Sequence, residues 1–222
     1  MNHKEVITKN ISKILEELKN DCKLIVVSKY RDIEDIKIAY NFGIRDFAEN
    51  RVQSLLERKS LLPIDIKWHL IGSLQSNKVK QIIDFISLIH AVDSEKILTE
   101  INKQASKIGR KVNILFQLHL AEEDTKHGFE INEFWDFLAS QPWKTYAFIN
   151  FCGIMAMATN TSDMQKIAKE FSTAQQILEK AKKLYSPYLL EFKELSIGMS
   201  SDYLKAQDYG STMVRIGSAV FE

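Results

Sequence analysis

The sequence predicts an α/β fold, a single (β/α)8 TIM barrel with an extra helix at the amino end. Eight segments have the composition of buried strands, and each of the first seven precedes a segment of helical period. No composition break or Pro/Gly-rich hinge interrupts this rhythm, which favours one domain over residues 1–222. About eight such units in this length match a small closed barrel. An open doubly wound sheet is the competing fold, but it more often carries a glycine-rich turn after its first strand.

Five aliphatic residues on one face of residues 5–19 predict a helix before the first strand. Strands are then expected at residues 24–29, 46–50, 67–72, 88–93, 112–120, 146–157, 192–199 and 213–221. The helix after the first strand should begin at Asp32 and end at Gly43. Two further helices are clear at residues 95–108 and 163–185, the latter opening with a capping box of Ser162 and Gln165.

The composition excludes several classes of protein. Thirty basic and 29 acidic residues give a net charge of +1, which argues against a protein that binds nucleic acid through bulk charge. The longest apolar run, residues 147–158, is too short to span a bilayer, so no membrane partner is expected. Cys22 and Cys152 lack metal-ligand spacing and indicate a reducing cytoplasm. We therefore expect a folded cytoplasmic protein. A monomer is also expected, although none of these counts bears on the number of subunits.

Lys29 is the first candidate functional residue. It follows four consecutive apolar residues, the pattern of a strand buried on both faces, and so lies where that strand meets solvent. Polar residues also gather at the carboxyl ends of the other strands, among them Asn50, His69 and His119. Barrels build active sites at this rim, although strand ends collect polar residues for structural reasons too. Lys29 could likewise be a lysine that merely ends a strand.

The last two units carry a sharper pattern. The seventh strand ends in Ser200 and Ser201 just before a helix, and the eighth contains Arg215, Gly217 and Ser218. Barrels often hold a phosphate between the loops after strands seven and eight, where glycine permits close approach and serine supplies donors. Pyridoxal 5'-phosphate (PLP) has two matching handles, a phosphate and an aldehyde that condenses with lysine. The pattern therefore indicates a PLP site between the first and last strands.

The chain resembles the PLP homeostasis protein family, whose members are relatives of the alanine racemase barrel. The matching segments span nearly the whole chain in order and include a Trp-His pair and a Gly-Ser-Thr-Met-Val-Arg run. They lie at residues 26–29, 47–53, 68–72, 74–78, 153–155, 195–200 and 210–217.

The resemblance implies roles for individual residues. Lys29 would form the internal aldimine with PLP, and Arg215 would lie near the pyridine nitrogen. Ser200, Gly217 and Ser218 would hold the phosphate, and Asn50 would lie at the edge of the cofactor. An arginine beside the ring nitrogen disfavours its protonation, because two cations there would repel. Arg215 could instead form an ion pair at the strand end.

Three functions fit these residues. The first, which we favour, is a carrier or regulator in intracellular PLP homeostasis that has no turnover and delivers PLP to apoenzymes. The second is a PLP-dependent amino-acid racemase, but such an enzyme needs a second domain and a tyrosine from a partner subunit. The third is a barrel that acts on phosphosugars, with Lys29 as an acid/base group.

Several other polar residues lie at strand ends or in loops. At strand five the chain has His119 where relatives commonly have asparagine, and we expect this ring to cap the strand. Residues 122–128 resemble the acidic loop of the family. His69 is expected to be a buried structural histidine, and residues 73–78 to start a capped helix.

Overall fold

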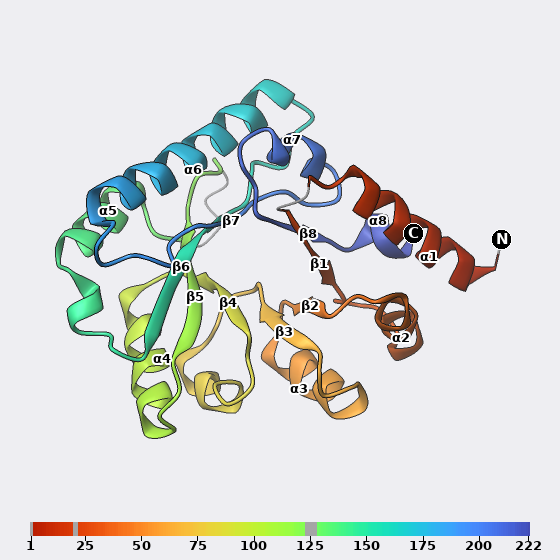
Figure 1. Ribbon diagram of the computed structural model, residues 1–222, viewed down its shortest axis with the longest axis horizontal. Coiled ribbons are helices and arrows are strands. Elements are labelled where there is room, and N and C mark those ends of the chain that lie inside the picture. The colour runs from red at the N-terminus through yellow and green to blue at the C-terminus, as the bar shows by residue number, and fades with distance from the viewer. Residues whose placement is uncertain (1, 20–21, 123–127) are drawn as a thin grey trace.

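A computed structural model describes residues 2–19, 22–122 and 128–222, and its strands form a closed, all-parallel barrel (Figure 1). Neighbours in the barrel follow the order of the chain, and β1 pairs with β8 to close it. The strands are β1 (Lys23–Val27), β2 (Asp46–Glu49), β3 (Lys67–Leu70), β4 (Leu88–Val92), β5 (Val112–Leu118), β6 (Ile149–Ala156), β7 (Glu194–Ser196) and β8 (Met213–Ile216). The predicted (β/α)8 TIM barrel is confirmed.

Helices surround the barrel on the outside (Figure 1). They are α1 (His3–Glu17), α2 (Ile33–Phe42), α3 (Val52–Leu61), α4 (Glu95–Lys107), α5 (Ile131–Ala139), α6 (Met164–Tyr185), α7 (Tyr203–Gln207) and α8 (Ser218–Phe221). The expected helix before β1 is α1, which packs against α2 and α8. Within the described residues, no helix is both long enough and apolar enough to cross a membrane.

Several element boundaries differ from the sequence prediction. The eighth strand was expected to run to residue 221, but it ends at Ile216, and Gly217 is the N-cap residue of the short helix α8. The apolar residues at 219–221 face the core from this helix, so hydrophobicity alone could not separate the two. The sixth strand was expected from residue 146 but begins at Ile149, because turn residues connect it to the preceding 3-10 helix, η2 (Pro142–Lys144).

Two helix starts were also wrong. The segment after β3 forms a 3-10 helix, η1 (Ser76–Gln81), and its flanking Gln75 makes no side-chain cap. At the start of α6, Asp163 is the capping residue in place of Ser162, and its carboxylate accepts the N–H groups of Gln165 and Lys166. An ionised aspartate so placed caps the helix strongly, and adjacent capping residues cannot be ranked from sequence alone.

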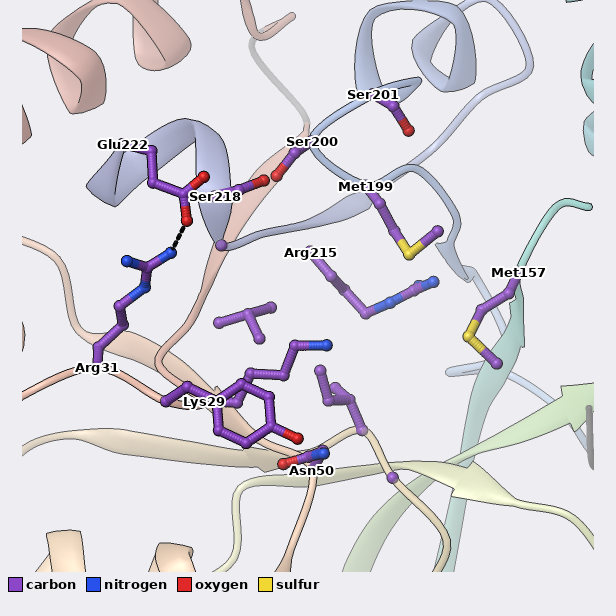
Figure 2. Close-up of a pocket in the computed structure, with 15 residues that line it drawn as sticks. Lys29, Arg31, Asn50, Met157, Met199, Ser200, Ser201, Arg215, Ser218 and Glu222 are labelled. Atoms are coloured by element: carbon purple, nitrogen blue, oxygen red, sulfur yellow. Dashed lines mark hydrogen bonds and ion pairs between the residues drawn. The ribbon is translucent and has the colours of Figure 1, made fainter. Parts of the chain in front are cut away.

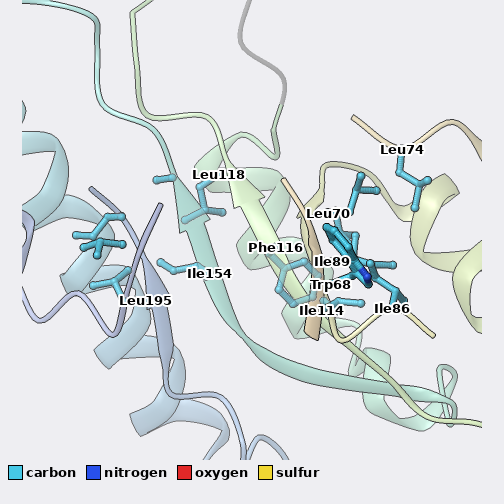
Figure 3. Packing of buried hydrophobic residues seen from close by; sticks show 14 of the residues in the cluster. Trp68, Leu70, Leu74, Ile86, Ile89, Ile114, Phe116, Leu118, Ile154 and Leu195 are labelled. Carbon is cyan, nitrogen blue, oxygen red and sulfur yellow. The ribbon is translucent and has the colours of Figure 1, made fainter. Parts of the chain in front are cut away.

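Buried side chains fall into two layers because both faces of each strand are covered. The larger cluster lies between the strands and the outer helices (Figure 3), and the smaller one fills the barrel interior. Phe116 on β5 is fully buried in the outer layer. Its ring stacks on Phe151 with centroids 5.5 Å apart and meets Phe134 edge-on at 5.4 Å. Such pairs add to the free energy of burial, so Phe116 anchors this side of the barrel.

Replacing Phe116 with alanine should lower the free energy of unfolding by about 3–5 kcal/mol, because the aromatic cluster would lose its centre. Urea denaturation followed by circular dichroism measures the change. Ile64→Ala is the control, since Ile64 is fully exposed and its loss should leave the midpoint unchanged. Equal midpoints for Phe116→Ala and the wild type would contradict this account of the core.

Candidate functional site

A cavity of about 670 Å³ opens at the carboxyl ends of the strands (Figure 2). Its volume lies within the range of small-molecule sites. All six residues predicted from sequence line it, although their roles in binding stay predictions. They are Lys29, Asn50, Ser200, Arg215, Gly217 and Ser218. In Figure 2 the amine of Lys29 points into the cavity from one side, and Ser200 and Ser218 lie on the other.

The sequence suggested that Lys29 is the last residue of the first strand. In the structure it lies in a tight turn that follows the strand. β1 ends at Val27, and the N–H of Arg31 donates to the carbonyl of Ser28 at 3.1 Å. Tyr30 has a φ of 64°, a left-handed conformation that costs a residue with a side chain about 1–2 kcal/mol. The turn bends the chain sharply away from the strand, so the exposed lysine side chain reaches into the cavity.

A buried ionic group that the sequence analysis missed holds this turn. Glu49, at the end of β2, is fully buried and accepts hydrogen bonds from the hydroxyl of Ser28 and from Arg58 on α3. Arg58 also donates to the carbonyl of Arg31 at 2.7 Å. Burial raises the pKa of Glu49, while Ser28 and Arg58 act in the opposite direction. These bonds tie the ends of β1 and β2 together on either side of Lys29.

Arg215 enters the cavity from β8 and is almost completely buried. Its Nη1 donates to the carbonyl oxygen and the hydroxyl of Ser196 at 2.6 and 2.7 Å, and its Nη2 donates to the carbonyl of Ala156 at 3.0 Å. Burial lowers the pKa of Arg215 to about 10, so the side chain stays cationic at neutral pH. Because these partners are neutral oxygens, the alternative of a strand-end ion pair does not describe these bonds.

The ends of β7 and β8 form the hydroxyl-bearing side of the cavity. Ser200 follows β7, and its hydroxyl accepts the N–H of Ala219 at 3.3 Å. Gly217 lies beside the end of β1, where a Cβ atom would sit 3.2 Å from the carbonyl oxygen of Val27. A glycine therefore lets the last strand pack closely against the first. Ser218 is exposed to solvent next to it.

Asn50 lies at the opposite edge of the cavity (Figure 2), immediately after β2. Its backbone touches Gly72, where a Cβ atom would meet the Asn50 carbonyl oxygen at 2.2 Å. The absence of a side chain at Gly72 thus allows the loop after β3 to pack closely against the backbone of Asn50. At the outer rim, Arg31 forms an ion pair with Glu222 (Figure 2), a contact that no local sequence pattern predicts.

Other predicted polar residues lie outside this cavity. The ring of His119 bonds to Glu130 at 2.7 Å and lines a separate depression beside α6. His69 is buried and hydrogen-bonded, as a structural histidine should be. The acidic loop falls largely on residues 123–127, which are outside the described residues. Lining residues that the sequence did not mark include Met157 and Met199.

A lysine, a buried arginine and serine hydroxyls around one barrel mouth define the class: a barrel with a small-molecule site at its carboxyl rim. The family model "Alanine racemase, N-terminal domain" matches residues 3–222. The "Pyridoxal phosphate homeostasis protein" of Pasteurella multocida is 34% identical over 221 residues, 97% of this chain and 93% of the relative. The protein of the same name from Synechocystis is 32% identical, covering 95% of both chains. The chain therefore belongs to the alanine racemase N-terminal domain family and, within it, to the pyridoxal phosphate homeostasis proteins.

Solved structures agree with this assignment. PipY of Synechococcus elongatus, solved with PLP bound, is 28% identical with a TM-score of 0.88, covering 97% of this chain and all of PipY. The alanine racemase of Clostridium difficile has a TM-score of 0.81 at 16% identity, and the match covers 97% of this chain and 56% of the racemase. At that identity the likeness to the racemase concerns the fold alone.

Replacing Arg58 with methionine should destabilise the protein by about 3–5 kcal/mol at neutral pH, because Glu49 would be left as an unpaired buried charge. The pKa of Glu49 in the folded state lies above its unfolded value. The unfolded state therefore releases its proton first, and stability falls as the pH rises between the two values. The decrease in the free energy of unfolding caused by Arg58→Met should therefore become smaller as the pH is lowered from 8 to 5.

Urea denaturation at each pH measures this effect. Lys37→Met is the matched control, because Lys37 makes an exposed ion pair with Glu34 and its removal should change stability little. A loss in Arg58→Met no greater than in Lys37→Met would contradict the role assigned to this buried pair.

Proposed function

We propose that this chain, as one domain over residues 1–222, binds PLP in the cavity at the carboxyl rim. The observation that carries the proposal is the convergence of Lys29, Arg215 and the three residues predicted to hold a phosphate, Ser200, Gly217 and Ser218, on one cavity. The related PipY, which has the same fold, was solved with PLP bound. Cavity volume and donor chemistry both fit the group: an amine for the aldehyde, and hydroxyl groups with an approachable glycine for the phosphate.

Lys29 is the residue proposed to hold PLP covalently. Its primary amine would attack the aldehyde carbon, and loss of the carbonyl oxygen as water would leave a carbon–nitrogen double bond, the lysine aldimine. The amine must be unprotonated to react, and its two hydrogens leave together with the aldehyde oxygen as that water. The Ser28–Glu49–Arg58 bonds support this role, because they fix the turn that presents the amine.

Arg215 and Asn50 are proposed to contact the ring. Arg215 keeps its Nε–H and one Nη2–H outside the three hydrogen bonds described above, and these are suited to an acceptor such as a pyridine nitrogen. A cation there disfavours a second proton on the ring, which makes the bound group a weaker electron sink. Asn50 is proposed to lie at the edge of the ring.

A weak electron sink suits storage or delivery better than amino-acid chemistry. We therefore propose a carrier or regulator of PLP without robust turnover, acting as a monomer in the cytoplasm and supplying apoenzymes. The family supports homeostasis as the physiological setting, since curated relatives bear that name. The two free cysteines, Cys22 and Cys152, support a reducing compartment. Lys29-dependent racemisation of free amino acids by the pure protein would contradict the absence of turnover.

Borohydride reduction of the PLP-treated protein should fix a pyridoxyl group on Lys29, because reduction makes the carbon–nitrogen bond permanent. Peptide mass spectrometry locates the adduct. Lys29→Ala should be largely unlabelled, whereas Lys23→Ala is the control, because Lys23 starts the same strand at the opposite end of the barrel. An adduct spread over surface lysines, with equal yield in Lys29→Ala, would contradict the proposed bond.

Arg215→Ala should weaken PLP binding about tenfold or more and shift the visible absorption band, because a charge-assisted hydrogen bond to the ring would be lost. Fluorescence titration and absorption spectra measure both effects. Arg51→Ala is the control, an exposed arginine at the start of α3. Unchanged affinity and spectrum in a folded Arg215→Ala protein would remove the role assigned to Arg215.

A further inference from the structure

Five polar side chains from five strands form a continuous hydrogen-bonded file inside the barrel. Asp46 Oδ1 lies 3.0 Å from His69 Nε2, and His69 Nδ1 lies 2.9 Å from His90 Nε2. His90 Nδ1 is then 3.0 Å from Ser196 Oγ, which accepts from Arg215 Nη1 at 2.7 Å. All but Asp46 are at most 4% exposed. We call these five residues the polar file.

Strand register explains why these residues meet. His69 pairs with Ala48 on one side and with Leu88 on the other, and both of those side chains belong to the interior cluster. His90 lies two residues after Leu88 and so faces the same way. Ser196 pairs with Met213, another interior residue. The file therefore runs through the centre of the barrel, from Asp46 at the start of β2 toward the cavity that Arg215 lines.

When both histidine rings are neutral, the two ends of the file fix the direction of every bond. A guanidinium only donates and a carboxylate only accepts. Since Asp46 accepts from His69 Nε2–H, the other nitrogen of neutral His69 must accept, and His90 must donate through Nε2. His90 Nδ1 then accepts the hydroxyl proton of Ser196, whose oxygen accepts from Arg215. In their neutral forms, both histidines are thereby in the same Nε2–H tautomer.

The surroundings favour the neutral form of both histidine rings. Burial lowers the pKa of His69, although the bond to Asp46 acts in the opposite direction. Burial, together with the charge of Arg215 and the neighbouring His69, holds the pKa of His90 well below its ordinary value. Lys23 and Lys67 are the other charged groups near the His69 end.

The carboxylate end is anionic. Burial alone would raise the pKa of Asp46, but the bond from His69 and the charges of Lys23 and Lys67 bring it below its ordinary value. Lys23 Nζ lies 3.9 Å from the carboxylate. The file therefore joins a carboxylate at one end of the barrel to a buried guanidinium at the other.

The polar file helps to stabilise the buried positive charge of Arg215. Arg215 is a buried cation whose hydrogen bonds go to neutral oxygens, and isolated buried charges are costly. Asp202, whose carboxylate accepts the N–H of Met199, contributes a favourable charge nearby. The aligned N–H and O–H groups of the file add to this, because each points its positive end away from Arg215 and toward Asp46.

We propose that Asp46, His69, His90 and Ser196 are positioning residues: they hold the guanidinium of Arg215 in one orientation and leave its Nε–H and one Nη2–H for a ligand in the cavity. The file fixes Nη1 completely, since both Nη1 protons are used by Ser196. Its effect on a bound cofactor rests on the proposed function, whereas the orientation itself is a property of the protein alone.

The first test uses the full-length protein without PLP. Nitrogen-15 NMR of the histidine rings should place both His69 and His90 in the neutral Nε2–H tautomer from pH 6 to 8. A charged ring or the Nδ1–H tautomer at either position at pH 7 would overturn the proposal. The Nη resonances of Arg215 should be resolved and slow to exchange with water, and Ser196→Ala should accelerate that exchange at least about tenfold. Unchanged exchange in Ser196→Ala would also overturn it.

The second test uses Asp46→Asn after PLP loading. Asparagine has the same shape but no charge and can also donate, so the direction of the file is no longer fixed. We expect about fivefold weaker PLP binding, a change corresponding to about 1 kcal/mol, and a shifted absorption band, with the pyridoxyl adduct still on Lys29. The control Asp65→Asn, which alters an exposed acid paired with Arg45, should behave as wild type.

Wild-type affinity and spectrum in both Asp46→Asn and Ser196→Ala would overturn the link to the cavity. Ser196→Ala replaces Asp46→Asn if the latter fails to fold. Absence of the Lys29 adduct in the wild type would instead refute the proposed function. The ring tautomers and the Arg215 exchange rates are measured without PLP, so they would still test whether the polar file orients Arg215.

Discussion

Closure of the barrel by β1 and β8 is the constraint on which the site depends. In this pairing Ile25 lies opposite Arg215 and Val26 opposite Ile216, so Gly217 comes beside Val27 at the ends of the two strands. The turn that carries Lys29 therefore borders residues from the far end of the chain. A slip in this register would turn Arg215 away from the interior, because neighbouring strand residues face opposite sides.

Two polar groups support the cavity from different directions. The Glu49–Arg58 pair lies outside the ring of strands and holds the turn before α2, whereas the polar file lies inside and holds Arg215. Neither group contributes much to the net stability of the fold, because the cost of burying polar groups offsets most of the free energy gained from their hydrogen bonds. The apolar layer around Phe116 supplies the stability that lets the barrel carry them.

Much of the site could be predicted from sequence because its residues follow strands, and the carboxyl ends of parallel strands converge in a barrel. Strand position and the family resemblance together pointed to Lys29, Asn50, Ser200, Arg215, Gly217 and Ser218, and all six do line one cavity. Of the supporting residues, His69 was expected to be a buried structural histidine, but the groups that it and the others contact could not be found. His90 reads as one residue of a buried strand, and its partners lie 21 and 106 positions away. Boundaries such as the end of β8 failed for a related reason, since a short buried helix and a buried strand have the same hydrophobicity.

A crystal structure of the protein grown with PLP tests the central claim most directly. We predict electron density continuous from Lys29 Nζ to the cofactor, with the phosphate beside Ser200, Gly217 and Ser218 and the ring nitrogen facing Arg215. Density for PLP at another surface, or in this cavity with its phosphate toward Asn50 and no link to Lys29, would contradict it.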